Sequence, residues 1–133
     1  KPEVLVELSA RYPVIACSVE EHVMFSSAEQ WTHGARIWRA EHSGEDGPIN
    51  LETSGTLPPS FQAMAEETAA EQLAEGGADA EVDHYFDLPL DAAKAITGFK
   101  HDERVPDVNY SKFDVLHDKE VPARTKPWWV FWK

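Results

Sequence analysis

The sequence predicts an α+β fold, a mostly antiparallel sheet of about five to seven strands packed against one long and one short helix. Three observations support this prediction. Short runs of β-branched and apolar residues, separated by turn residues, fill the first third of the chain. A helical pattern bounded by prolines and glycines follows. The first half lacks the strand–helix alternation of a parallel sheet. At 133 residues, the chain has the size of one domain, residues 1–133.

The expected strands of the first half occupy residues 3–9, 14–19, 22–25, 35–42 and 49–54. Residues 26–31 are ambiguous, because Ser26 and Glu29 fit a capping box that would start a helical turn, whereas the same residues also suit a strand. The run Ser-Gly-Glu-Asp-Gly-Pro at 43–48 is the clearest turn signal. Together these segments predict an antiparallel meander.

A long helix is expected to start near Pro58-Pro59 and to run to about Glu75, where Gly76-Gly77 ends it. At 100° per residue, one side of this helix carries an apolar row, and roughly the opposite side carries an acidic row. The apolar row is Phe61, Ala65, Ala69 and Leu73, and the acidic row is Glu67, Glu71 and Glu75.

Alternation of acidic and apolar residues at 78–87 predicts a strand with one core face and one carboxylate face. The core face would hold Ala80, Val82, His84 and Phe86, and the other face Asp79, Glu81, Asp83, Tyr85 and Asp87. Pro89 then begins a short helix over 90–97, which Gly98 ends.

The C-terminal region is expected to form a loop at 99–112, a strand at 113–117 and a linker between Pro122 and Pro127. The chain then closes on an aromatic run, 128–132, which is apolar on both faces if it is a strand. Such a strand suits the centre of a sheet. It equally suits an exposed strand that joins two copies, and that homodimer would form through Trp128, Trp129 and Trp132.

The negative charge is concentrated in the middle of the chain. The formal net charge is −12, and no Lys or Arg lies between Arg39 and Lys94, a stretch that holds thirteen acidic residues. One interpretation is solubility, and the other is a docking surface for a basic protein. We do not expect direct binding to nucleic acid, because such binding requires clustered Lys and Arg. No apolar run is long enough for a membrane helix.

No motif for catalysis, a cofactor or a metal is present, and we expect none of these. The six histidines form no zinc-binding spacing, and His84 is predicted to be a core histidine. The carboxylates at 79, 81 and 83 could hold Ca²⁺ or Mg²⁺, or act as a pair in glycoside hydrolysis, but neither pattern is complete. Cys17, in an apolar run, is predicted to be a buried hydrophobe, and a single cysteine is compatible with a reducing compartment such as the cytoplasm.

The leading hypothesis is a small, soluble, acidic protein-binding module that inhibits or regulates a basic protein partner. Immunity proteins and other inhibitors of bacterial toxins share its small size, acidity and lack of motifs, which is an analogy of composition. The predicted partner-binding residues are Glu67, Glu71, Glu75, Asp79, Glu81, Asp83 and Asp87. The alternatives are an enzyme that uses carboxylates and a histidine, and a homo-oligomeric accessory protein.

Overall fold

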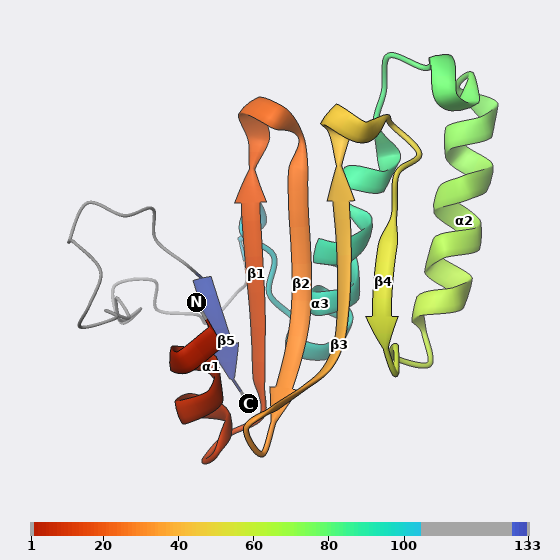
Figure 1. Cartoon of the computed structure of the whole chain (residues 1–133). Helices are drawn as coiled ribbons and strands as arrows, with labels where there is room; N and C mark the ends of the chain where they lie inside the picture. Colours follow the sequence, from red (N-terminus) through yellow and green to blue (C-terminus); the bar gives the residue numbers. More distant parts are fainter. Residues whose placement is uncertain (1, 105–128, 133) are drawn as a thin grey trace.

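A computed structural model describes residues 2–104 and 129–132 of the chain. The α+β class and the antiparallel sheet are confirmed (Figure 1): the strand order is β4-β3-β2-β1-β5, and every adjacent pair is antiparallel. The strands are β1 (Val14–Glu20), β2 (Phe25–Thr32), β3 (Ala35–Ser43), β4 (Glu52–Gly55) and β5 (Trp129–Trp132).

The expected number of five to seven strands is too high for residues 2–104, which form four strands. The segment expected as the first strand is helix α1 (Pro2–Ser9). Its valines suggest a strand, but Pro2 and Glu3 suit the first turn of a helix. Leu5 and Ser9, four residues apart, are both buried, which is the spacing of one helical face.

The strand predicted at 78–87 is also wrong. This segment contains two short 3₁₀ turns, η3 (Gly77–Asp79) and η4 (His84–Phe86), and no strand. The Asp83 side chain accepts a hydrogen bond from the Phe86 backbone N–H, which closes a turn where a strand would have to continue. The acidic residues therefore do not form a ladder on one sheet face.

Residues 26–31, which were ambiguous, belong to β2. The expected strand at 22–25 is instead the 3₁₀ turn η1 (Glu21–Val23), followed by Met24 in the left-handed region, so β1 and β2 form a hairpin. A second short 3₁₀ turn, η2 (Gly44–Asp46), lies in the connection from β3 to β4, where the turn was expected.

Both predicted helices are present as α2 (Phe61–Ala74) and α3 (Leu88–Thr97), and Gly98 ends α3 in the left-handed conformation. The buried side of α2 differs from the predicted apolar row. Gln72 is 1% exposed, whereas Leu73 is 75% exposed and Ala69 is also exposed. The helix is thus rotated about its axis so that Phe61 and Gln72 face inward.

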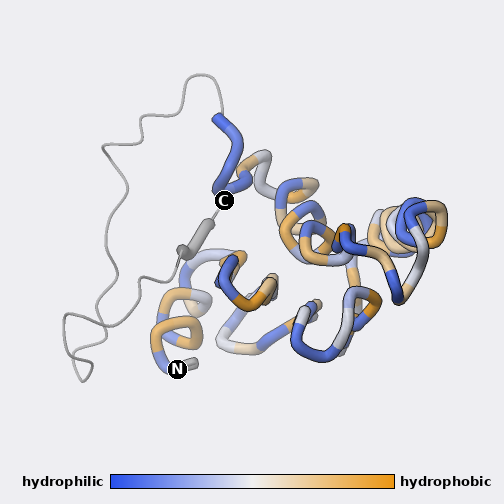
Figure 2. The backbone as a smooth tube through the Cα atoms, turned by 90° about the horizontal axis from the view of Figure 1, so that it is seen from above, coloured by the Kyte–Doolittle hydropathy of each residue, from blue (hydrophilic) through white to orange (hydrophobic). Residues whose placement is uncertain are grey.

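The sheet has a core on each face. Figure 2, a view along the sheet from above, shows α2 and α3 together on one side. There Trp38, Ile15 and Phe61 pack with Leu88 and Leu90 of α3. On the opposite face Leu5 of α1 packs with Val14, Ala16 and Trp31. Side chains alternate along β1, so this strand contributes to both cores. Ile15 and Cys17 face α3, and Val14 and Ala16 face α1.

Strand β5 pairs with β1, from Val14 opposite Trp132 to Cys17 opposite Trp129. Among the described residues it stands at the end of the strand order, next to β1 alone, and a central position of the aromatic run stays a prediction. Trp128 and the loop, strand and linker expected between 105 and 127 lie outside the described residues. None of the described helices is both long and apolar enough to cross a lipid bilayer.

Candidate functional site

Three connections meet at one end of the sheet and border a shallow hollow of about 390 Å³ that is open to solvent. In Figure 1 they are the β1–β2 turn, the β3–β4 connection and the segment that leaves the upper end of α2. We call residues 76–83 of that segment the acidic loop. The lining residues are His22, Val23, Met24, Gly44, Glu45, Pro48, Ala78, Asp79, Ala80, Glu81 and Asp83.

Two walls of the hollow are bonded directly to each other. The Gly44 N–H donates to the Met24 carbonyl at 3.0 Å, which joins the β3–β4 connection to the β1–β2 turn. A Cβ atom on residue 44 would lie 2.7 Å from the Met24 Cβ, closer than non-bonded carbons approach. Glycine at position 44 is therefore required for this close approach.

Gln72 of α2 fixes the acidic loop from inside the protein. Its Nε2 donates to the carbonyls of Gly77 at 2.9 Å and Val82 at 2.8 Å. Its Oε1 accepts from the His84 backbone N–H at 2.8 Å. One buried side chain thus supplies hydrogen bonds that this irregular backbone does not obtain from a strand or a long helix.

The acidic loop is also tied to the sheet through His42 of β3, which is 0% exposed. His42 Nε2 lies 2.7 Å from Asp83 Oδ2, and His42 Nδ1 lies 2.6 Å from the Asn50 carbonyl oxygen. The imidazole ring also stacks on Tyr85, with 6.4 Å between the ring centroids. His42 therefore connects β3, the β3–β4 connection and the acidic loop.

Both nitrogens of His42 face acceptors. Nδ1 lies against the Asn50 carbonyl oxygen and Nε2 against Asp83 Oδ2, so each ring nitrogen has a partner within the chain. Neither nitrogen is left free to take a proton from a substrate, so this buried pair suits a structural role.

The predicted partner-binding residues fall into two groups. Five are exposed to solvent, and these are Glu67, Glu71 and Glu75 of α2 with Asp79 and Glu81 of the acidic loop. Two have partners within the chain. Asp83 bonds to His42, and Asp87 lies 2.9 Å from Lys100. Burial would lower the pKa of Lys100, but the hydrogen bonds that Lys100 donates to Asp87 and Asp91, together with their negative charge, outweigh burial and raise that pKa.

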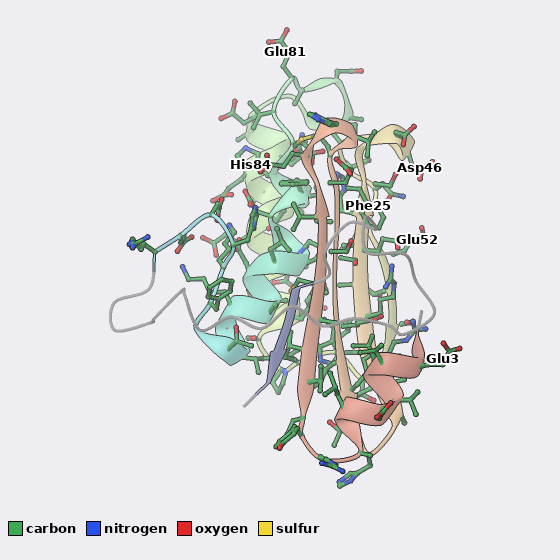
Figure 3. All side chains as sticks on the ribbon, turned by 90° about the vertical axis from the view of Figure 1, so that its left-hand side faces the viewer. Glu3, Phe25, Asp46, Glu52, Glu81 and His84 are labelled. Atoms are coloured by element: carbon green, nitrogen blue, oxygen red, sulfur yellow. The ribbon has the colours of Figure 1, made fainter. Side chains whose placement is uncertain are left out.

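The acidic row of α2 and the acidic loop adjoin each other. Glu71 Oε2 lies 3.7 Å from His84 Nδ1, directly beyond the loop. Gln72, the next residue of α2, bonds to both ends of the loop. Figure 3 shows Glu81 projecting from the upper end of the molecule, far from Glu3 of α1. The acids at the end of α2 and those of the loop therefore form one surface, which we call the acidic cap: Glu71, Glu75, Asp79 and Glu81.

The described residues show little that resembles a catalytic centre. Burial, with a smaller effect of Glu29, raises the pKa of Cys17 to about 12, so its thiol is not a nucleophile at neutral pH. Within residues 2–104, no three His, Cys, Asp or Glu side chains are grouped as metal ligands. His84, expected in the core, is partly exposed, although its Nε2 is buried without a partner.

Sequence reasoning missed the roles of His42 and Gln72. For His42 a signal existed, because it follows Trp38 and Ala40 at a spacing of two on the buried face of β3. For Gln72 there was none, since a glutamine in an acidic helix is normally a solvated residue. Comparison of the chain with protein-family models, curated proteins and solved structures finds no match.

Proposed function

We propose that this chain is a protein-binding module that inhibits or regulates a basic protein partner, as an immunity protein neutralises a toxin, and that it binds through the acidic cap. The observation that carries the proposal is the way the cap is built. Gln72 and His42 are 1% and 0% exposed; Gln72 bonds to the acidic loop and to His84 directly after it, and His42 bonds to Asp83 of the loop through Nε2.

Buried polar groups are tolerated only when they are bonded, and they are less favourable than apolar packing of the same shape. A fold that keeps two of them to hold one exposed acidic loop favours a function that needs a fixed arrangement of carboxylates. Solubility alone would need the charge but not the fixed geometry. Preformed charge of one sign also speeds the encounter with an oppositely charged protein.

The test is a pull-down from lysate of the native source with the immobilised chain, at low and high salt, followed by mass spectrometry. We expect one stoichiometric basic protein that dissociates as the salt concentration rises. Recovery of no basic protein under either condition would contradict the proposal. A cytoplasmic location, suggested by the single cysteine, is part of the proposal, and the compartment of the recovered partner checks it.

Two charge-reversed variants locate the surface. The first carries Glu71→Lys and Glu75→Lys, and the control carries Glu3→Lys and Glu7→Lys in α1, which lies toward the other end of the sheet (Figure 1). Both variants change the net charge equally. We expect the first to slow association with the recovered partner about tenfold or more, and the control to have a much smaller effect. Equal effects would mean that total charge, and not the acidic cap, governs binding.

Within the described part of the sheet β5 is an edge strand, and this position favours a second candidate function, self-association through the C-terminal aromatic run. Edge strands are the usual place for pairing with another chain. Light scattering of the full chain over a range of concentrations tests this candidate, for which we expect a dimer. A monomer at all concentrations would rule it out and leave the acidic cap unaffected.

A further inference from the structure

Strand β4 forms an open edge of the sheet beside α2. It stands at one end of the strand order, and among the described residues no strand lies beyond it. All four of its residues, Glu52–Gly55, are exposed, so α2 leaves this edge uncovered although the two elements are neighbours in Figure 1. The edge therefore offers backbone groups to which a further strand can bond.

The register of β4 shows which of its backbone groups face outward. Ser54 lies opposite Arg39. Two residues later, the Thr56 N–H donates to the Ile37 carbonyl at 2.9 Å, so Thr56 belongs to a hydrogen-bonded pair. In an antiparallel ladder, such pairs alternate with pairs that exchange no hydrogen bonds. Ser54 therefore bonds to β3, whereas the N–H and the carbonyl of Thr53 point away from β3 toward the free edge.

On one face of this edge, two carboxylates lie directly opposite each other. Glu52 of β4 is paired in register with Glu41 of β3, and like charges in this arrangement destabilise a sheet. Arg39 compensates Glu41, but none of the salt bridges among residues 2–104 involves Glu52. Figure 3 shows Glu52 on the side of the sheet away from α2 and α3. A cation on a strand added beside β4 would compensate this carboxylate.

The other face of the same edge is apolar. Thr53 lies opposite Ala40, which is buried in the core beneath α2 and α3. Leu51 and Leu57 flank β4 in the sequence and pack, partly buried, against that core. Because side chains alternate along a strand, an added strand would place every second side chain beside this apolar surface and the others beside Glu52. A segment that alternates apolar and basic residues fits both faces.

A single extended segment suits this edge better than a second copy of the sheet. Figure 2 shows α2 in the same layer as α3, and Figure 1 shows it beyond β4 at the edge of the sheet. Antiparallel pairing of β4 from two copies would bring two α2 helices into one layer over the joined strands. It would also bring two Glu41–Glu52 pairs together, which adds like charge to like charge.

We propose that β4 binds one extended segment of the basic partner as an added strand, with a lysine or arginine beside Glu52 and apolar side chains on the side of α2. This proposal rests on the proposed function, since the segment belongs to the partner that the acidic cap attracts. Backbone hydrogen bonds at Thr53 would supply affinity, and the side chains on the two faces would supply specificity.

The experiment is an NMR titration of the full ¹⁵N-labelled chain at pH 7.5 and low salt. The probe is acetyl-Lys-Val-Lys-Val-Lys-amide, and its control is the same peptide with both valines N-methylated. The valine opposite Thr53 would share its face and turn its N–H toward β4, so N-methylation removes the bonds and keeps the charge. We expect saturable shifts at the amides of residues 52–55 for the probe, and affinity about tenfold lower for the control.

Two substitutions at one position separate backbone pairing from side-chain contact. Thr53→Pro removes only the outward N–H, and proline is tolerated on edge strands where the N–H faces solvent. Thr53→Ala keeps that N–H. We expect Thr53→Pro to lower probe affinity about tenfold and Thr53→Ala to lower it less than about threefold. The ¹⁵N spectrum of each variant shows whether it is folded.

A second pair of variants tests the edge without a change to the backbone. Glu52→Lys reverses the charge beside the proposed lysine or arginine, and Glu3→Lys makes the same change in net charge on α1. Lysine is common on edge strands, so β4 should remain formed. We expect Glu52→Lys to lower probe affinity about fivefold or more, and Glu3→Lys less than about twofold.

Equal binding of the N-methylated peptide would overturn the strand site, as would equal effects of Glu52→Lys and Glu3→Lys. A dimer of the chain that Thr53→Pro abolishes would also overturn it, because a second copy would then occupy the edge. The proposed function would remain in these cases if the pull-down still recovered a basic protein in a salt-dependent way. If no basic protein were recovered there, the proposed function would fail whatever the titration gave, so the two failures are distinguishable.

Discussion

The His42–Asp83 pair is the polar contact on which the acidic loop depends most. The His42 side chain is 0% exposed and that of Asp83 11% exposed, and the ring is bonded on both sides. A buried pair of this kind adds little net stability compared with apolar packing, but removal of one partner leaves the other buried and uncompensated. The pair therefore fixes geometry and makes position 42 sensitive to change.

His42→Ala is expected to lower the free energy of unfolding by about 3–5 kcal/mol, because it leaves Asp83 without its partner and creates a cavity where the imidazole ring was buried. Urea denaturation at pH 7 measures this loss. His22→Ala is the matched control, since His22 is exposed on the rim of the hollow, and it should change stability by about 0.5 kcal/mol or less. Similar effects of the two substitutions would contradict the structural role of His42.

Cys17 links stability to alkaline pH. Burial, with a smaller effect of Glu29, raises the pKa of its thiol to about 12 from the ordinary value of 9.0. Between these values the unfolded chain has released the proton and the folded chain has kept it, so stability falls as pH rises. The protonated thiol is compatible with the core at every lower pH.

Cys17→Ala should remove this part of the alkaline loss. By pH 10.5 the native protein is expected to lose about 2 kcal/mol more than the variant, relative to pH 8, from the titration of one thiol. Urea denaturation of both proteins across this range gives the difference directly. Parallel pH profiles would mean that the thiol ionises in the folded state as readily as in the unfolded state.

At the scale of elements, Gln72 couples a regular helix to an irregular loop. Gln72→Ala removes three hydrogen bonds and leaves the Gly77 and Val82 carbonyls and the His84 N–H without their partner. We expect a loss of about 2–4 kcal/mol, since each orphaned buried group costs about 1–3 kcal/mol and water can reach some of them. Hydrogen exchange should accelerate at residues 77–84 but not in β2.

Gln62→Ala is the control for that prediction. Gln62 is exposed and donates to Glu66 one turn later at 2.7 Å. Such surface pairs contribute only a few tenths of a kcal/mol. If Gln72→Ala left the exchange of residues 77–84 unchanged, the loop would be held by other contacts, and the preformed acidic cap would lose its main support.

The elements show what the sequence could and could not predict. Both helices ended by glycine were predicted closely, because proline and glycine act on the local backbone. Residues 3–9 were predicted as a strand from their valines and other apolar residues, and residues 78–87 from the alternation of acidic and apolar residues. Alternation does not reveal a side-chain hydrogen bond such as Asp83 to Phe86, or the support that Gln72 gives from another element. The first of these contacts is local and the second joins two elements, and neither is visible in the pattern of residue types.

For the candidate site, too, the sequence predicted some features and could not predict others. Exposure of the acids at 67, 71, 75, 79 and 81 followed from their type, since acidic side chains are rarely buried without partners. Their arrangement did not follow, because it depends on how the acidic loop folds back over α2. The hollow could not be predicted at all, since its lining comes from three segments that are distant in the sequence.

At the scale of the whole molecule, the negative charge is distributed unevenly. All excess negative charge lies between Arg39 and Lys94, and the acidic cap is at one end of the sheet, opposite α1. Charge separated in this way orients an approaching basic protein as well as attracting it, because the field is strongest at one end. This geometry is the reason that charge reversal at Glu71 and at Glu3 should have unequal effects.

The pairing of β5 with β1 joins the C-terminal aromatic run to the rest of the sheet. The first four residues of strand β1, Val14, Ile15, Ala16 and Cys17, are each at most 8% exposed, and β5 pairs with all four. A chain that ends at Lys126 would leave that edge of β1 unpaired. An unpaired, flat, apolar strand edge promotes association with other chains.

We therefore expect the chain that ends at Lys126 to be less stable, to exchange its β1 amides faster and to aggregate at concentrations where the full chain does not. Deletion of Lys133 alone, which leaves the β1–β5 register untouched, is the control. Denaturation, hydrogen exchange and light scattering follow the three effects. If the shortened chain remained a monomer of unchanged stability, β5 would contribute nothing to the sheet, and self-association through the aromatic run would lose its structural basis.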